Sequence, residues 1–140
     1  MMQVCPHLCF RGECEAAFTI YERLTGGKVV TMLKYGDSPA MEQVPLEWRE
    51  KIVHASLSLT GSTLSGADVL PEHYVKPQGF FVLLNVADIA DADRLFRGLA
   101  DGGTVRMPLQ KTFWSAGFGV LVDRFGIPWE VSCGQATGVA

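Results

Sequence analysis

A repeated helical pattern limits the folds available to this chain. Four apolar residues at i, i+3, i+4 and i+7 spacing recur at a constant offset of 75 residues: Ala17, Ile20, Tyr21 and Leu24, then Ala92, Leu95, Phe96 and Leu99. This spacing predicts one-sided helices over residues 15–24 and 89–101, with Asp88 as the N-cap of the second. A glycine pair ends each pattern, because glycine adopts the left-handed conformation at little cost.

Each predicted helix follows one strand candidate and precedes three more. The strand candidates, rich in β-branched and aromatic residues, are 4–10, 28–35, 52–59 and 62–67, then 79–86, 104–111, 118–123 and 128–133. Residues 36–51 form an insertion that is expected to be partly helical around residues 46–50. The element order is therefore βαβββ, repeated once.

This order predicts an α+β fold in a single domain of two modules. Their expected bounds are 1–68 for the first module, 69–78 for a linker, 79–134 for the second module and 135–140 for a tail. One helix covers only one face of its sheet. Pairing the modules would bury part of the other faces and leave a concave mixed sheet around a trough, where we expect a ligand.

The composition excludes several kinds of partner. With a net charge of −3 and scattered Lys and Arg residues, a nucleic-acid partner is not expected. No apolar stretch approaches the roughly 20 residues that span a bilayer, and no secretory signal is visible. We therefore expect a cytoplasmic protein without a membrane partner. Its four cysteines are expected to be reduced thiols.

Two segments near the C-terminus carry a family resemblance. Residues 110–119 read QKTFWSAGFG and residues 123–129 read DRFGIPW. Together with the opening LCFRG at 8–12, they resemble the PhnB-like branch of the vicinal-oxygen-chelate superfamily of glyoxalases, bleomycin-resistance proteins and dioxygenases. Some members of this branch carry the label 3-demethylubiquinone-9 3-methyltransferase. The sequence has no glycine-rich turn between a strand and a helix that would hold S-adenosylmethionine.

The resemblance implies a divalent metal held by the first and last strand of each module, with adjacent substrate oxygens bound to it. Carried over position by position, the four ligand positions are Cys5, Ser65, Phe81 and Glu130. Because Phe81 has no donor atom and Ser65 is a weak ligand, we expect no metal cofactor. Zinc held by Cys5, His7 and Glu130 is the alternative left open.

The same positions predict a ligand cavity. Strand alternation places Cys5 and His7 on one face, and we expect both to share a cavity with Ser65, Phe81 and Glu130. The alternative for Cys5 and His7 is a plain cavity wall.

Three further interpretations concern the second half of the chain. Glu130 interrupts an apolar strand and is the candidate general base, unless it pairs with an arginine or lies at a sheet edge. Trp114 is a candidate for stacking on the ligand at the entrance, unless its aromatic cluster belongs to the core or to a dimer contact. Gln110 could add a polar contact to the ligand.

The sequence leaves two functions open. The chain is either a lyase- or isomerase-like enzyme acting on a small oxygenated metabolite, or a non-catalytic protein that binds a small molecule, as bleomycin-resistance proteins do. The resemblance and the open trough also predict a homodimer with a two-fold contact, because a second copy could cover the trough.

Overall fold

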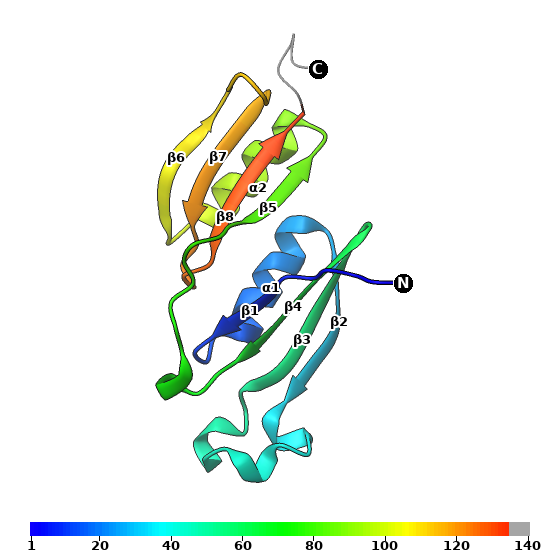
Figure 1. The fold of residues 1–140 in the computed structure, drawn as a ribbon, viewed down its shortest axis with the longest axis vertical. Coiled ribbons are helices and arrows are strands. Elements are labelled where there is room, and N and C mark those ends of the chain that lie inside the picture. Colours follow the sequence, from blue (N-terminus) through cyan, green and yellow to red (C-terminus); the bar gives the residue numbers. More distant parts are fainter. Residues whose placement is uncertain (135–140) are drawn as a thin grey trace. The chain divides into compact units, whose positions relative to one another are not determined.

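The computed structural model describes residues 1–134 and divides into two compact units, with the boundary between Val75 and Lys76. In each unit one α-helix packs on one face of a four-stranded sheet (Figure 1). The predicted α+β fold of two βαβββ modules is confirmed. The boundary falls within the predicted linker, and the predicted tail at 135–140 lies outside the described residues.

The first unit has the strand order β1-β4-β3-β2. Its elements are β1 His7–Phe10, α1 Cys14–Thr25, β2 Lys28–Lys34, β3 Ile52–Leu59 and β4 Ser62–Asp68. Strand β1 pairs with β4 in parallel, and the other pairs are antiparallel. The insertion contains short 3₁₀ turns, including Leu46–Trp48, where a partly helical segment was predicted.

The second unit repeats this topology with the order β5-β8-β7-β6. Its elements are β5 Val82–Val86, α2 Ile89–Ala100, β6 Thr104–Gln110, β7 Gly117–Val122 and β8 Pro128–Cys133. Strand β5 is parallel to β8, as β1 is to β4. Neither α-helix of the described chain is long and apolar enough to cross a membrane.

The two helices bury slightly different faces. In α2 all four predicted core residues are buried, and Asp88 caps the helix by accepting the backbone N–H groups of Ala90 and Asp91. In α1, Ile20 is only half-buried, whereas Phe18 is fully buried. The reason lies in the sheet beneath: a Cβ at Gly66 would lie 2.8 Å from the Phe18 ring, so this glycine makes room for that ring.

A buried carboxylate ties the first unit together. Asp68, at the end of β4, is 1 % exposed. Its Oδ1 accepts the backbone N–H groups of Gly12 and Cys14 at 2.9 Å each, and its Oδ2 accepts that of Ile52 at 2.9 Å. One side chain therefore fixes the start of α1 and the start of β3 to the last strand of the sheet.

In the second unit a buried hydroxyl group joins the start of β7 to the end of β8. Ser115 is fully buried just before β7, with its Oγ 2.7 Å from the carbonyl oxygen of Gly117 and 3.0 Å from that of Cys133. A separate carboxylate, Asp123, holds the β7–β8 turn: it accepts the N–H groups of Phe125 and Ile127.

Candidate functional site

Each sheet has one face that its own helix does not cover, which we call the open face. In the first unit Gly66 faces α1, because a Cβ there would contact Phe18. Side chains alternate along a strand, so the neighbouring Ser65 lies on the open face.

The same reasoning locates the open face of the second unit. A Cβ at Gly119 would lie 2.5 Å from the Phe96 ring of α2, so Gly119 faces the helix. Its neighbour Val120 therefore lies on the open face, together with Glu130, its partner on β8.

A polar row crosses the open face of the first sheet. The strand register aligns His7 with Ser65, Ser65 with Ser56, and Ser56 with Thr31. The Nδ1 atom of His7 lies 2.9 Å from the Oγ atom of Ser65, so the structure brings these two predicted site residues into a hydrogen bond. The Ser65 hydroxyl also lies 3.3 Å from the carbonyl oxygen of Pro6.

The imidazole of His7 is tuned by its surroundings. Burial lowers the pKa of His7 below its usual value, and the nearby imidazole of His54 lowers this pKa further. His54 is exposed on β3, two residues from Ser56 on the same face. One ring nitrogen of His7 is directed at the Ser65 hydroxyl.

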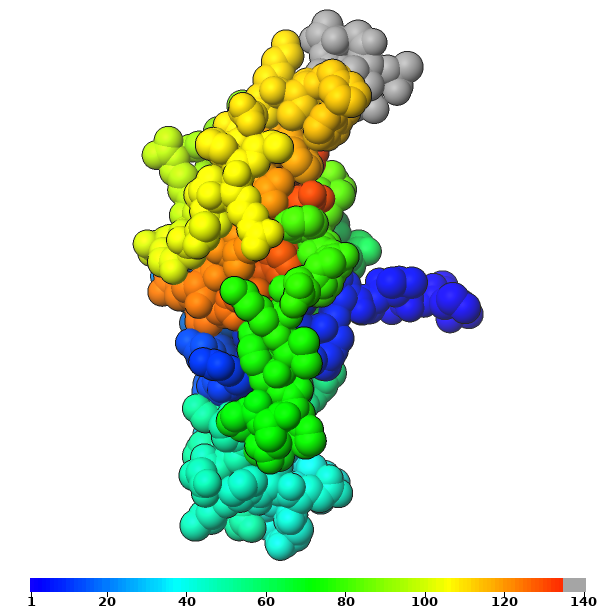
Figure 2. All heavy atoms as spheres, turned by 60° about the vertical axis from the view of Figure 1, so that its left-hand side comes forward, coloured from blue at the N-terminus to red at the C-terminus, as the bar shows by residue number. Residues whose placement is uncertain are grey.

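The other predicted residue of this unit, Cys5, lies outside the sheet. It belongs to the exposed segment that precedes β1, which Figure 2 shows in blue, extending from the surface of its unit. It therefore lies outside the strand that positions His7. Strand β1 begins at His7, whereas the sequence predicted a strand from Val4.

The open face of the second sheet is mostly apolar. At the positions equivalent to the polar row, the register aligns Leu83 with Glu130, Glu130 with Val120, and Val120 with Met107. The pair Leu83–Glu130 thus corresponds to His7–Ser65, which agrees with the internal alignment of Ser65 with Glu130. Glu130 is partly exposed, and both of its cross-strand neighbours are apolar.

Exposed aromatic rings adjoin this face. The ring of Trp114 lies 5.2 Å from that of Phe118 and 4.6 Å from that of Phe113, in edge-to-face geometry. Trp114 is 39 % exposed and Phe113 is 77 % exposed. Gln110 pairs with Phe118 across β6 and β7, so Gln110 and Trp114 both adjoin the same ring. By contrast, Trp129 is a core residue whose Nε1 donates to Asp123.

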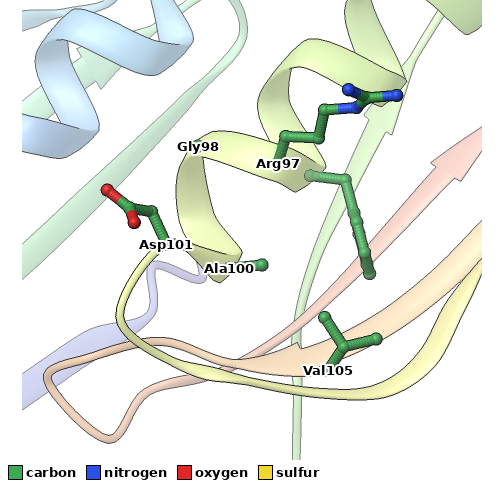
Figure 3. A pocket seen from close by; sticks show the side chains of 6 residues that line it. Arg97, Gly98, Ala100, Asp101 and Val105 are labelled. Carbon is green, nitrogen blue, oxygen red and sulfur yellow. The ribbon is translucent and has the colours of Figure 1, made fainter.

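A shallow hollow of about 540 Å³ lies elsewhere on the second unit, at the C-terminal end of α2 (Figure 3). It is lined by Phe96, Arg97, Gly98, Ala100, Asp101 and Val105. None of the predicted site residues belongs to this hollow.

The predicted site residues are divided between the units. The first unit contains Cys5, His7 and Ser65, and the second contains Phe81, Gln110, Trp114 and Glu130. Phe81 is 40 % exposed and precedes β5. Within each unit the structure places them on or beside one open face, with Cys5 in the segment before it. The single cavity shared by both groups stays a prediction.

The donor set does not fit the divalent metal that the resemblance implies. Phe81 offers no donor atom, and the Ser65 hydroxyl is engaged with His7. Within residues 1–134, no group of three or more His, Cys, Asp or Glu side chains is placed to hold a metal ion.

Sequence reasoning missed several residues that the structure brings forward. Ser56, His54 and Thr31 lie on the open face beside the predicted pair His7 and Ser65. The alternation His54-x-Ser56-x-Ser58 in a confirmed strand is the signal that could have revealed two of them. Asp68 and Ser115, the buried anchors, carried no comparable local signal, because their partners lie far away in the sequence.

Comparison with known proteins settles the family. The profile of the family described as 3-demethylubiquinone-9 3-methyltransferase matches residues 2–132. The chain belongs to this family. Protein YjdN of Escherichia coli strain K12 is similar to this chain. The two are 30 % identical over an alignment of 139 residues, which covers 94 % of this chain and 95 % of YjdN.

Solved structures agree with the fold of this family member. Protein PA1353 of Pseudomonas aeruginosa superposes with a TM-score of 0.88 and 43 % identity, over 97 % of this chain and 100 % of that one. The PhnB protein of Bacillus cereus superposes with a TM-score of 0.80 and 21 % identity, over 95 % of this chain and 100 % of that one. A glyoxalase/bleomycin resistance protein/dioxygenase family enzyme of Burkholderia phytofirmans superposes with a TM-score of 0.63 and 12 % identity, over 92 % of this chain and 95 % of that one. The resemblance to the PhnB-like branch and its glyoxalase-type fold is confirmed.

Proposed function

We propose that this protein binds a small molecule that carries an aromatic or apolar part, and that the open face of the second sheet is where this part rests. The observation that supports the proposal is the exposed ring of Trp114 beside Phe113 and Phe118, next to an apolar row that contains one carboxylate. Exposed rings next to an apolar surface with few polar groups are typical of ligand sites.

The polar groups of this face would orient the ligand. Glu130 lies between Leu83 and Val120, where its carboxylate could accept a hydrogen bond from a ligand N–H or O–H group. Gln110 offers an amide beside the Phe118 ring. Such binding needs neither a metal nor a covalent step. It corresponds to the alternative in which the protein binds a small molecule without catalysis, as bleomycin-resistance proteins do.

An enzymatic role is the second candidate, and Glu130 is the observation that favours it. A carboxylate flanked by apolar side chains is suited to take a proton from a bound substrate, as a lyase or isomerase requires. Methyl transfer has no support in the local structure, because the β1–α1 and β5–α2 connections lack a glycine-rich turn for a nucleotide cofactor.

A dye titration would test the binding proposal. Trp114 fluorescence is expected to change on addition of an anilinonaphthalene sulfonate dye, with saturation at micromolar concentrations. Trp114→Ala should weaken binding at least tenfold, and Glu130→Gln should change the affinity without changing the unfolding midpoint. The control is Val105→Ala, an exposed apolar residue of β6 outside the aromatic cluster. Equal dye affinity in the wild type and Trp114→Ala would contradict the proposal.

We also propose that the protein is a homodimer, with apolar residues near β5 in the contact. Phe80, Phe81 and Leu83 are 48 %, 40 % and 47 % exposed, which is more apolar surface than one short segment usually leaves in water. Sedimentation equilibrium at micromolar concentration should give twice the chain mass, and Phe80→Glu should shift the protein towards monomer. A monomer at that concentration would refute this assignment.

A further inference from the structure

The connection between β6 and β7 carries two exposed rings. Strand β6 ends at Gln110 and β7 begins at Gly117, so residues 111–116 lie between the strands, with Phe113 and Trp114 both exposed. Side chains on exposed loops are usually mobile, and ordering such a side chain when a ligand binds costs conformational entropy. The value of the Trp114 ring as a ligand contact therefore depends on how firmly this connection holds it.

Two hydrogen bonds close the connection into a tight turn. The backbone N–H of Thr112 donates to the carbonyl oxygen of Ser115 at 3.0 Å. In return, the backbone N–H of Ser115 donates to the hydroxyl oxygen of Thr112 at 3.1 Å. We call residues 112–115 the ring turn, because the two residues between its tied ends are Phe113 and Trp114.

The ring turn is anchored in its sheet through one end. Ser115 is fully buried, and its Oγ accepts the backbone N–H groups of Gly117 and Cys133 at 3.2 Å and 3.3 Å. The next residue, Ala116, donates its backbone N–H to the carbonyl oxygen of Cys133 at 3.0 Å. The Thr112 hydroxyl therefore ties the other end of the turn to a residue that belongs to the core of the unit.

The Trp114 ring is also supported by its neighbours. The planes of the Trp114 and Phe113 rings meet at 79°, and those of the Trp114 and Phe118 rings at 67°. Such edge-to-face pairs are favourable beyond the apolar area that they bury. Since Phe118 belongs to β7, the indole is fixed through its backbone by the ring turn and through its ring by the sheet.

We propose that Thr112 and Ser115 are positioning residues, which hold the Trp114 ring ready to stack on a planar aromatic ligand. The inference rests on the proposed function and deepens it, since it names a flat ring, rather than a flexible alkyl chain, as the part of the ligand that this site selects. A fixed indole loses little entropy when a second ring stacks on it, whereas an alkyl chain must itself be ordered.

A pair of simple ligands tests this selection. 1-Naphthalenesulfonate and 1-decanesulfonate have the same number of carbon atoms and the same charged group, but one is flat and the other is flexible. The decyl chain has the larger apolar area, so burial of apolar surface alone favours it. Isothermal titration calorimetry should nevertheless show that the wild type binds naphthalenesulfonate at least fivefold more tightly. Equal or tighter binding of decanesulfonate would overturn the inference.

Substitutions at Thr112 test the positioning role. Thr112→Val keeps the size of the side chain but removes the acceptor for the Ser115 N–H. Naphthalenesulfonate binding should weaken at least threefold, whereas decanesulfonate binding and the unfolding midpoint should change little, because the bonds of the Ser115 hydroxyl remain. Thr112→Ser keeps a hydroxyl and should restore the affinity. The matched control is Thr104→Val, the same change at an exposed position of β6, which should bind as the wild type does.

A spectroscopic measurement follows the ring itself. The full chain is labelled with 5-fluorotryptophan, and the fluorine NMR signal of Trp114 is assigned with Trp114→Phe. Thr112→Val should shift or broaden this signal and leave those of Trp48 and Trp129 in place, and Thr112→Ser should restore it. An unchanged Trp114 signal in Thr112→Val would refute the positioning role.

The two proposals fail in different ways. If naphthalenesulfonate binds the wild type and Thr112→Val equally well, the inference fails while the proposed function stands. If neither sulfonate binds the wild type, the proposed function fails and takes this inference with it.

Discussion

The two sheets have the same register, yet their open faces differ in chemistry. Ser56 and Val120 occupy equivalent positions and are each 9 % exposed, but one is a hydroxyl without a partner and the other is apolar. His54 and Phe118 are likewise equivalent: one is an exposed imidazole and the other supports the Trp114 ring. The repeat therefore preserves the strand order and the strand pairing, whereas the open faces differ in chemistry.

The largest expected effect compares the two buried anchors. Asp68→Ala removes an acceptor from three backbone N–H groups, so it should lower the free energy of unfolding by about 3–5 kcal/mol. Ser115→Ala removes a neutral hydroxyl and should cost about 1–2 kcal/mol. Urea unfolding followed by circular dichroism measures both. Equal losses would mean that the carboxylate anchors its unit no better than the hydroxyl does.

A second pair of substitutions compares the two helices. Leu95 is 4 % exposed, so Leu95→Ala should cost about 2–5 kcal/mol through lost contacts and a cavity. Its repeat equivalent, Ile20, is half-buried, so Ile20→Ala should cost about half as much. The same urea titrations apply. A greater loss at Ile20 would show that α1 turns a different face to its sheet.

The third comparison tests the equivalent positions Ser56 and Val120 on the two open faces. Val120→Ser should cost about 1–2 kcal/mol, because it replaces buried apolar surface with a hydroxyl. Ser56→Ala should be nearly neutral or slightly stabilising, because its hydroxyl has no partner to lose. Thermal unfolding of both variants beside the wild type measures the difference. A clear loss of stability in Ser56→Ala would reveal a hydrogen bond that the Ser56 hydroxyl makes inside the protein.

The smallest effect is the pH dependence contributed by His7. Folding lowers its pKa, so the unfolded chain binds the proton more tightly. This contribution is fully present above about pH 6.5 and is lost as the pH falls from there through the folded-state pKa. The stability of wild type relative to His7→Gln should therefore decrease between pH 7 and pH 5. A difference that stays constant over this interval would contradict the lowered pKa.

The fold was accessible from the sequence because its signals are local and repeated. Strands β3 and β8 have the predicted starts and ends, and both helices lie within one or two residues of their predicted bounds. Two strands start three residues later than predicted: β1 begins at His7 and β5 at Val82. At β1, Pro6 has no N–H group for the strand pairing, although its carbonyl oxygen accepts the backbone N–H of Ser65 at 3.0 Å. The buried face of α1 differs from the predicted one because Gly66, which is distant in sequence, makes room for the Phe18 ring.

The site was accessible only in part. Alternation and the internal alignment predicted that His7 and Ser65 share a cavity and that Ser65 is equivalent to Glu130. The register shows this equivalence and pairs His7 directly with Ser65, whereas the shared cavity stays a prediction. They gave no means to see that Ser56 is covered and without a partner, since burial depends on the assembled sheet. For Asp68 and Ser115 the partners lie in other elements, so the role of each emerges only from the folded chain.

The parallel pairing of β1 with β4 has a consequence for synthesis of the chain. The first strand of each unit can pair only with its last, so a nascent first unit cannot close its sheet before Asp68 leaves the ribosome. Until then β1 exposes both of its edges, and the start of α1 lacks the carboxylate that fixes it. Closing a loop of this length is slow and entropically costly. Each unit should therefore fold in one late step, and nascent chains arrested before Asp68 should be sensitive to protease.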